Sequence, residues 1–296
     1  MHAPFVMVGL VTLGAVGLAA RESAAQPTRP AATQPAQRPP TLREAVQRLQ
    51  SSNPDEVSDA IDALTRIGTP EVVPPLVALI HQGLPDDLLE TVVTKLGIIG
   101  RPEAIDELSA LLHHRRPAVR QKAVTALSRI RDPRVRALIE SALRDSDGAV
   151  RGEAATALGR INARASVELL QRAFERNVPE AAESIGALGD VAAADRLLEA
   201  VGRARLSVLL PGFRRFLDRR DLSDDTKVRI IEQLVTRAPT AEVKAFLREW
   251  VATVLPTDRT RTRARARAER AIRQINDAPA GSPAPAAAPT PAGGAR

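Results

Sequence analysis

Apolar residues recur at helical spacing along most of this chain, and the clearest case is the stretch 145–161, DSDGAVRGEAATALGRI. Ala154, Leu158 and Ile161 stand at positions i, i+4 and i+7, which fall on one face of a helix. The Asp-Ser-Asp-Gly before them supplies side chains that cap a helix N-terminus. This pattern predicts a short amphipathic helix, capped by Asp147 or Ser146, that ends near residue 161.

The same pattern recurs along the chain. Its leucine falls, in steps of 32, 31, 31 and 30 residues, at Leu64, Leu96, Leu127, Leu158 and Leu188. Shorter helices are predicted between these copies, over residues 72–80, 104–112, 135–143, 167–174 and 192–201. Because one two-helix unit of this size cannot bury its apolar face alone, the copies are predicted to stack into an α-solenoid.

Proline, glycine and threonine mark the predicted helix ends. Prolines stand at the first helical turn, at positions 70, 102 and 133, where the missing N–H costs nothing. Glycines are expected to take the left-handed conformation after helix C-termini at Gly68, Gly83, Gly100 and Gly189. Residues 41–44, TLRE, have the spacing of a capping box. Pro211-Gly212 is expected to split the segment 206–219 into shorter helical pieces.

The repeated segments resemble a known family. VRQKAVTALSRI (119–130) and VRGEAATALGRI (150–161), each preceded by a short helix, are similar to HEAT repeats, and closest to the short repeats named after phycobilisome lyases. The resemblance is best over 101–175 and extends over 54–100 and 176–201. It implies an all-α, right-handed α-α superhelix of the HEAT/armadillo type, in which the second helix of each pair lines the concave side. Such a motif specifies a fold far better than a function.

The two ends of the chain differ from its middle. Residues 5–20 form an apolar run that suits a signal peptide, followed by Ser23-Ala24-Ala25, which fits cleavage before Gln26. No Lys or Arg precedes the run, so an uncleaved anchor at 5–20 stays open. We therefore expect export, to a periplasm or a cell surface. The predicted organisation is a signal peptide at 1–25, a Pro/Ala-rich linker at 26–40, HEAT-like repeats at 41–201, irregular and C-terminal repeat pairs at 202–256, a basic capping helix at 257–277, and a disordered Pro/Ala-rich tail at 278–296.

The net charge of +7 comes from the ends, because residues 41–255 hold equal numbers of basic and acidic residues. Aromatic residues make up only 2% of the chain. A neutral, aromatic-poor solenoid argues against nucleic acid as a partner. The concentrated basic element is a ladder that could contact an anionic surface, formed by Arg259, Arg261, Arg263, Arg265, Arg267 and Arg270.

The sequence offers no constellation for catalysis or metal binding. Cysteine is absent, and the four histidines show no H-E-x-x-H spacing. Residues 145–148 lack the later ligands of a calcium loop, since Ala149 and Thr156 stand at its fifth and twelfth positions. Ser184 stands in a helix at a position equivalent to the buried Ala154, which does not suit a nucleophile. We expect no enzyme activity, no metal and no cofactor.

The surface predicted to bind a protein is the solvent side of the second helices. Its residues are Asp62, Arg66, Glu90, Lys122, Arg129, Glu153, Thr156, Arg160 and Glu183. The alternative is a solvated face with local pairs such as Asp62–Arg66, which contribute only about 0.2–0.5 kcal/mol. Arg120 and Arg151 are assigned instead to structural contacts between repeats, with Asp145 or Asp147.

These observations favour an exported, non-catalytic scaffold or adaptor that binds a protein partner on the concave face. Two alternatives stay open. The repeat subtype suggests a bilin-lyase-like chaperone, although export and the lack of aromatic residues argue against it. The other is a membrane-anchored adaptor, which would contact anionic surfaces through the C-terminal Arg-rich helix.

Overall fold

The computed structural model describes residues 38–277, and this part of the chain is all-α. The predicted signal peptide, residues 26–37 of the linker and the C-terminal tail lie outside the described residues. The helices are α1 (Leu42–Arg48), α2 (Pro54–Ile67), η1 (Pro70–Val72), α3 (Val73–His81), α4 (Asp86–Ile99), η2 (Pro102–Ala104), α5 (Ile105–Leu111), α6 (Pro117–Leu127), α7 (Arg134–Ala142), α8 (Gly148–Arg160), η3 (Arg164–Ser166), α9 (Val167–Glu175), α10 (Ala181–Leu188), α11 (Val191–Glu199), α12 (Leu206–Asp218), α13 (Asp224–Arg237), α14 (Ala241–Thr253) and α15 (Thr262–Asp277).

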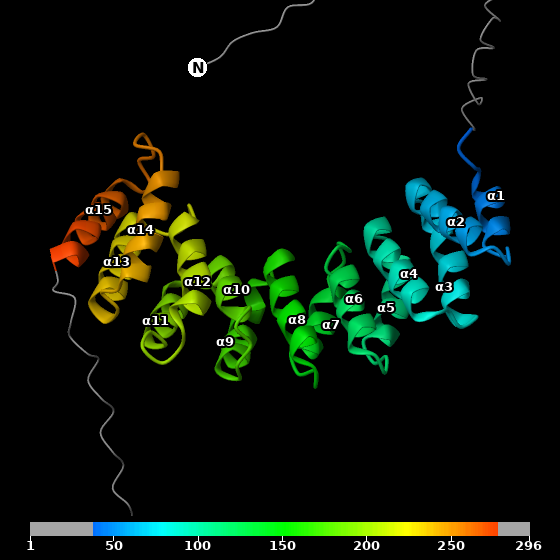
Figure 1. Cartoon of the computed structure of the whole chain (residues 1–296), viewed down its shortest axis with the longest axis horizontal. Helices are drawn as coiled ribbons and strands as arrows, with labels where there is room; N and C mark the ends of the chain where they lie inside the picture. The colour runs from blue at the N-terminus through cyan, green and yellow to red at the C-terminus, as the bar shows by residue number, and fades with distance from the viewer. Residues whose placement is uncertain (1–37, 278–296) are drawn as a thin grey trace, which may run out of the picture. The chain divides into compact units, whose positions relative to one another are not determined.

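The helices form two layers of stacked pairs (Figure 1). The second helices, α2, α4, α6, α8, α10, α12 and α14, each pack against the next one along the chain. The first helices, from α3 to α11, pack against the second helix that follows them. This arrangement confirms the predicted all-α solenoid. Each copy of the repeated leucine pattern corresponds to one helix pair of the stack.

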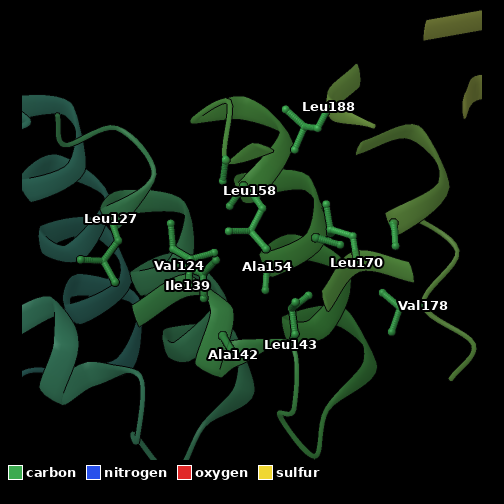
Figure 2. Packing of buried hydrophobic residues seen from close by; sticks show 14 of the residues in the cluster. Val124, Leu127, Ile139, Ala142, Leu143, Ala154, Leu158, Leu170, Val178 and Leu188 are labelled. Carbon is green, nitrogen blue, oxygen red and sulfur yellow. The ribbon is translucent and has the colours of Figure 1, made fainter. Parts of the chain in front are cut away.

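The leucines that set the period are buried at the centre of this stack. Leu64, Leu96, Leu127 and Leu158 are completely buried and Leu188 nearly so. Figure 2 shows such leucines between side chains of the neighbouring first helices, including Ile139 from α7 and Leu170 from α9. Each fully buried leucine contributes about 1.5–3 kcal/mol of transfer free energy, so these stripes supply much of the stability.

Most helix ends follow the sequence prediction. The capping box at α1 is present: Thr41 Oγ1 accepts from Glu44 N at 3.4 Å, and Glu44 Oε2 accepts from Thr41 N at 2.8 Å. Asp147 caps α8 by accepting from two backbone N–H groups. The three glycines at 68, 83 and 100 have positive φ as predicted. Gly189 does not, because its φ is −70°. A Cβ at Gly189 would lie 2.6 Å from that of Ala193, so close packing explains this glycine.

The prediction that Pro211-Gly212 splits the segment 206–219 is wrong, because α12 runs unbroken through both residues. Pro211 is solvent-exposed. Gly212 is buried, and a Cβ there would overlap the carbonyl oxygen of Ala182 in α10. A Cβ at Gly186 in α10 would likewise overlap the carbonyl oxygen of Gly212. The glycines allow α10 and α12 to approach closely, and this packing offsets the cost of a proline inside the helix.

The C-terminal helix closes one end of the stack. α15 packs on α13 and α14, with Ala264, Ala268 and Ala271 completely buried. It begins at Thr262 instead of at residue 257 of the predicted segment, because Asp258 holds a turn in front of it by accepting from Thr260 N at 3.0 Å. The carboxylate of Asp224, in α13, accepts from the first N–H groups of α15, at 2.7 and 2.9 Å. One side chain of α13 therefore caps α15.

Candidate partner-binding face

One register position of the second helices gives the predicted binding face its pattern. Two residues after the first four of the buried leucines stand Arg66, Ile98, Arg129 and Arg160, and all four are exposed. Ile98 is 53% exposed, which is unusual for a large apolar side chain. The four residues lie on one side of the array, since α2, α4, α6 and α8 are neighbours in a single layer.

Several predicted face residues bind partners in adjacent repeats. Asp62 pairs with Lys95 Nζ at 2.6 Å, so the predicted Asp62–Arg66 pair is wrong, and Arg66 Nε donates to the backbone carbonyl of Asp62 instead. Lys95 lies on α4, the next helix of the layer, and its ammonium group reaches the carboxylate of Asp62. Glu90 pairs with Arg116 Nη2 at 3.4 Å.

The same cross-repeat bonding continues further along the chain. Glu153 accepts from Thr125 Oγ1 at 2.7 Å, and Arg160 donates to Ser128 Oγ at 2.6 Å. Glu183 pairs with Arg215 of α12 at 2.7 Å. These bonds join one repeat to the next. The residues that make them therefore stabilise the stacking of the repeats and also form part of the surface.

Three of the predicted face residues have side chains that are available to a partner. Lys122, Arg129 and Thr156 are exposed, and their side chains have no hydrogen-bond or ion-pair partner within residues 38–277. Two shallow hollows of about 270 and 100 Å³ lie between α4 and α6, and Lys122 lines both. Glu90 lines the first and Arg129 the second. The structure therefore brings Glu90, Lys122 and Arg129 to one part of the face, while Thr156 lines neither hollow.

The two arginines assigned to structural contacts behave differently. Arg120 binds Asp145 through Nε at 2.7 Å and Nη2 at 2.6 Å, as predicted. Arg151 also binds Asp145, but Arg151 Nη1 donates to the backbone carbonyls of Asp145 and Ser146, in the turn before its own helix, so the predicted contact between repeats is wrong. Asp145 faces the guanidinium of Arg120, so Arg151 closes the turn in front of its own helix.

The arginine ladder of α15 is largely occupied within the fold. Arg261 pairs with Asp258, Arg263 with Asp225, Arg265 with Glu269 and Arg267 with Glu232, at 2.7, 2.5, 3.0 and 3.0 Å. Only Arg259 and Arg270 of the predicted six have no side-chain partner in the described chain. Most of the charge predicted for an anionic surface is thus compensated by carboxylates of the protein.

A buried lysine lies under this C-terminal part, and no sequence pattern indicated it. Lys227 in α13 is completely buried, and its Nζ has no hydrogen-bond partner in the described structure. Burial, with the nearby charge of Arg261, lowers the pKa of Lys227 below its ordinary value of 10.5, while Asp224 and Asp258 oppose the shift. A buried ammonium without a partner destabilises the fold.

Two larger hollows are also present that no sequence pattern had indicated. One, of about 750 Å³, lies between α9 and α11, where Phe174 and Leu197 are among its apolar lining and Arg196 pairs with Glu168 at its rim. The other, of about 660 Å³, lies where the turns after α6 and α8 meet, and it is rich in arginine. Both depend on how adjacent repeats are spaced, and one-dimensional periodicity does not encode that spacing.

The described residues show no group of three acidic or histidine side chains arranged to hold a metal ion. His81 ends α3 as expected and its Nε2 lies 2.8 Å from Glu107 Oε2. Ser184 is buried, and its hydroxyl donates to the carbonyl of Ala155 at 2.8 Å. Between residues 38 and 277, none of the helices has both the length and the apolar character needed to cross a membrane.

Stacked two-helix units with one apolar stripe each define the class of this protein as an α-solenoid. The family model for HEAT repeats matches it over residues 39–117, 85–147, 106–179 and 135–209. These matches span more than half of the chain, which therefore belongs to the HEAT-repeat family. No curated protein matches the chain in sequence.

Three structures are similar to this chain at low sequence identity. The complex of CpcE and CpcF of phycocyanin lyase from Nostoc sp. PCC7120 is 17% identical, with a TM-score of 0.44, over 84% of this chain and 98% of that one. An engineered protein is 18% identical, with a TM-score of 0.39, over 78% of this chain and 68% of its own. A homology model of the full-length AP-3 complex is 15% identical, with a TM-score of 0.40, over 76% of this chain and 40% of its own.

Proposed function

We propose that this protein is a non-catalytic scaffold that binds a protein partner on the face formed by α4, α6 and α8. One observation carries the proposal: Ile98, 53% exposed, occupies the same register position as the exposed Arg129 of the next repeat. The two helix ends are adjacent, since a Cβ at Gly100 would lie 3.6 Å from the carbonyl oxygen of Arg129. An exposed apolar side chain beside uncommitted cations is typical of an interface centre with a polar rim.

The cross-repeat bonds support the same proposal because they make the face rigid. Asp62–Lys95, Thr125–Glu153 and Ser128–Arg160 each join neighbouring second helices. A preorganised surface loses little conformational entropy when a partner binds. Lys122, Arg129 and Thr156 can then bind a partner without breaking contacts within the protein.

The setting of this scaffold is part of the proposal. The apolar segment 5–20 followed by Ser23-Ala24-Ala25 favours export, with action in a periplasm or at a cell surface. A membrane-anchored adaptor that uses α15 on anionic surfaces is less favoured, because most of the α15 ladder is paired internally. No contact in the described chain favours a bilin-lyase-like chaperone.

Site-specific photo-cross-linking in the source cells tests the binding face. A photo-reactive amino acid at position 98 should give one discrete cross-linked partner, and the cross-link should be lost when Lys122→Glu and Arg129→Glu are added together. The matched control places the same group at Ala137, an exposed residue of α7 in the other layer. Equal cross-linking from both positions, or none from position 98, would show that this face is not the interface. Mass spectrometry of the mature N-terminus tests export, and an intact Met1 contradicts cleavage.

A further inference from the structure

Arginines gather around one hollow at the edge of the array, where the turn after α6 meets the turn after α8. The hollow measures about 660 Å³, and we call it the arginine hollow after five of its lining residues, Arg129, Arg131, Arg136, Arg160 and Arg164. Asp132 is the one acidic residue of the lining. Ile130, Val135 and Ala163, which are buried in the core, form its apolar base.

Two of these arginines carry charge that nothing in the described chain compensates. Arg129 and Arg131 are exposed, and their side chains have no partner among residues 38–277. Asp132 forms no ion pair with either of them. Its carboxylate accepts hydrogen bonds from Arg134, through Nε at 3.0 Å, Nη2 at 3.1 Å and the backbone N at 2.8 Å. Arg134 does not line the hollow.

The other three arginines form ion pairs while remaining exposed, and Arg160 also donates to Ser128 Oγ at 2.6 Å. Arg136 lies 3.3 Å from Glu140, Arg160 lies 3.5 Å from Glu153, and Arg164 lies 3.2 Å from Asp221. Each of these arginine side chains is more than 40% exposed, so these ion pairs contribute little to stability. Their remaining N–H donors are available to a ligand that carries carboxylates.

The solenoid itself does not require an arginine at the centre of this hollow. Arg131 stands four residues after Leu127, and the two preceding repeats have Gly68 and Gly100 at that position, with φ of 64° and 67°. The following repeat has Asn162, with φ of 55°. The turn after α6 thus departs from the left-handed turn of its neighbours, and fold requirements do not account for its positive charge.

We propose that the arginine hollow binds an acidic peptide segment of the partner protein, rich in Asp or Glu. This inference rests on the proposed scaffold function and names the chemistry of its partner. Guanidinium groups form bidentate hydrogen bonds with carboxylates, and the apolar base suits the methylene groups of the segment. Arg129 and Arg160 also belong to the binding face, so a partner seated there can extend such a segment into the hollow.

The basic lining is confined to two turns, which favours a short acidic segment over a long polyanion. A nucleic acid backbone is bound by a basic track along the protein surface. The equivalent positions of the preceding repeats provide glycine instead. A hollow of this size is typical of sites that hold a compact group of atoms.

The test uses the full chain and a fluorescein-labelled hexaglutamate peptide, with hexaglutamine as the neutral control, by fluorescence anisotropy at low ionic strength. We expect hexaglutamate alone to bind, and Arg131→Glu to weaken its binding about tenfold or more. Arg131→Lys keeps the charge but loses the planar fork, so we expect a loss of only a few-fold. Arg115→Glu lies in the loop before α6, outside both the hollow and the binding face, and we expect it to change hexaglutamate binding less than about twofold. Thermal melts should be the same for all variants, because Arg131 and Arg115 are exposed and their side chains make no bonds in the described chain.

Several results would overturn the inference. Unchanged binding by Arg131→Glu places the acidic peptide elsewhere, for example on Arg259 and Arg270 of α15. Tighter binding of pyrophosphate than of hexaglutamate indicates a small-anion site, and tighter binding of a labelled single-stranded oligonucleotide indicates a nucleic acid site. The proposed function fails separately, because its test is cross-linking from position 98. If that cross-link is absent while hexaglutamate still binds, the proposed partner-binding face is contradicted and the acidic-peptide site in the arginine hollow is not.

Discussion

Arg120 and Asp145 form a bidentate pair across the joint between two repeats, with Nε–Oδ2 at 2.7 Å and Nη2–Oδ1 at 2.6 Å. Both side chains are only 11% exposed. Asp145 also accepts from the backbone N of Asp147, the residue that caps α8. One carboxylate therefore connects α6 to the start of the next second helix.

We expect Arg120→Ala to lower the free energy of unfolding by about 1.5–3 kcal/mol, because it leaves Asp145 partly buried without its cation. Arg120→Lys should recover less than half of this loss, since an ammonium cannot reproduce the two parallel bonds. Urea denaturation measures both. Arg115→Ala, an exposed residue of the same loop whose side chain makes no bond in the described chain, is the control and should change stability by less than about 0.5 kcal/mol.

The same pair makes stability depend on acid. The hydrogen bonds from Arg120 lower the pKa of Asp145 below 3.8, so the folded state holds its carboxylate ionised more strongly than the unfolded state does. This contribution is fully present above pH 3.8 and is lost as the pH falls through the lower pKa of the folded protein. The urea midpoint of the wild type should therefore fall more steeply below pH 3.8 than that of Arg120→Ala. Parallel curves for the two proteins would contradict the linkage.

Close contact between α10 and α12 predicts a large effect of a single methyl group. Gly186→Ala places a Cβ against the carbonyl oxygen of Gly212, and backbone cannot move aside as a side chain can. We expect a loss of about 2 kcal/mol or more, despite the better helix propensity of alanine. Gly148→Ala is the matched control, because its nearest neighbour is the mobile end of Arg151 at 3.6 Å. Thermal melts should show a lower midpoint for the first variant and an unchanged or higher midpoint for the second.

Lys227 should be a position where an apolar residue improves the protein. Lys227→Met retains most of the volume and removes a buried nitrogen without a partner, so we expect a gain of about 1–3 kcal/mol at neutral pH. Burial lowers the pKa of Lys227, so the wild type gains stability as the pH rises toward 10.5 and the amine becomes neutral in both states. The variant should lack this gain. A lower denaturation midpoint for Lys227→Met at pH 7 would show that the ammonium is stabilised in the fold.

The sequence predicted those features that depend on residues close together in the chain. The leucine period, the capping box at Thr41 and the cap at Asp147 are local patterns, and the structure confirms them. The Arg120–Asp145 pair was also predicted, from an arginine that follows valine in two successive repeats, although Arg151 makes no equivalent pair.

The features that failed depend on the spacing between helices. Asp62 binds Lys95 instead of Arg66 because the next helix of the layer brings an ammonium nearer. Pro211 was expected to break a helix, yet Gly212 holds that helix against α10. The arginine hollow forms only when two turns from different repeats meet, and no single segment shows it.

The cap that Asp224 places on α15 has a consequence for assembly. A solenoid whose last repeat is left open presents an apolar end that fits the beginning of another copy, and such contacts generate filaments. Here α15 lies over α13 and α14, with three alanines completely buried beneath it, while its outward side carries arginines. The helix therefore covers an apolar surface of α13 and α14, and we expect a chain truncated before Thr262 to expose that surface and to associate head to tail.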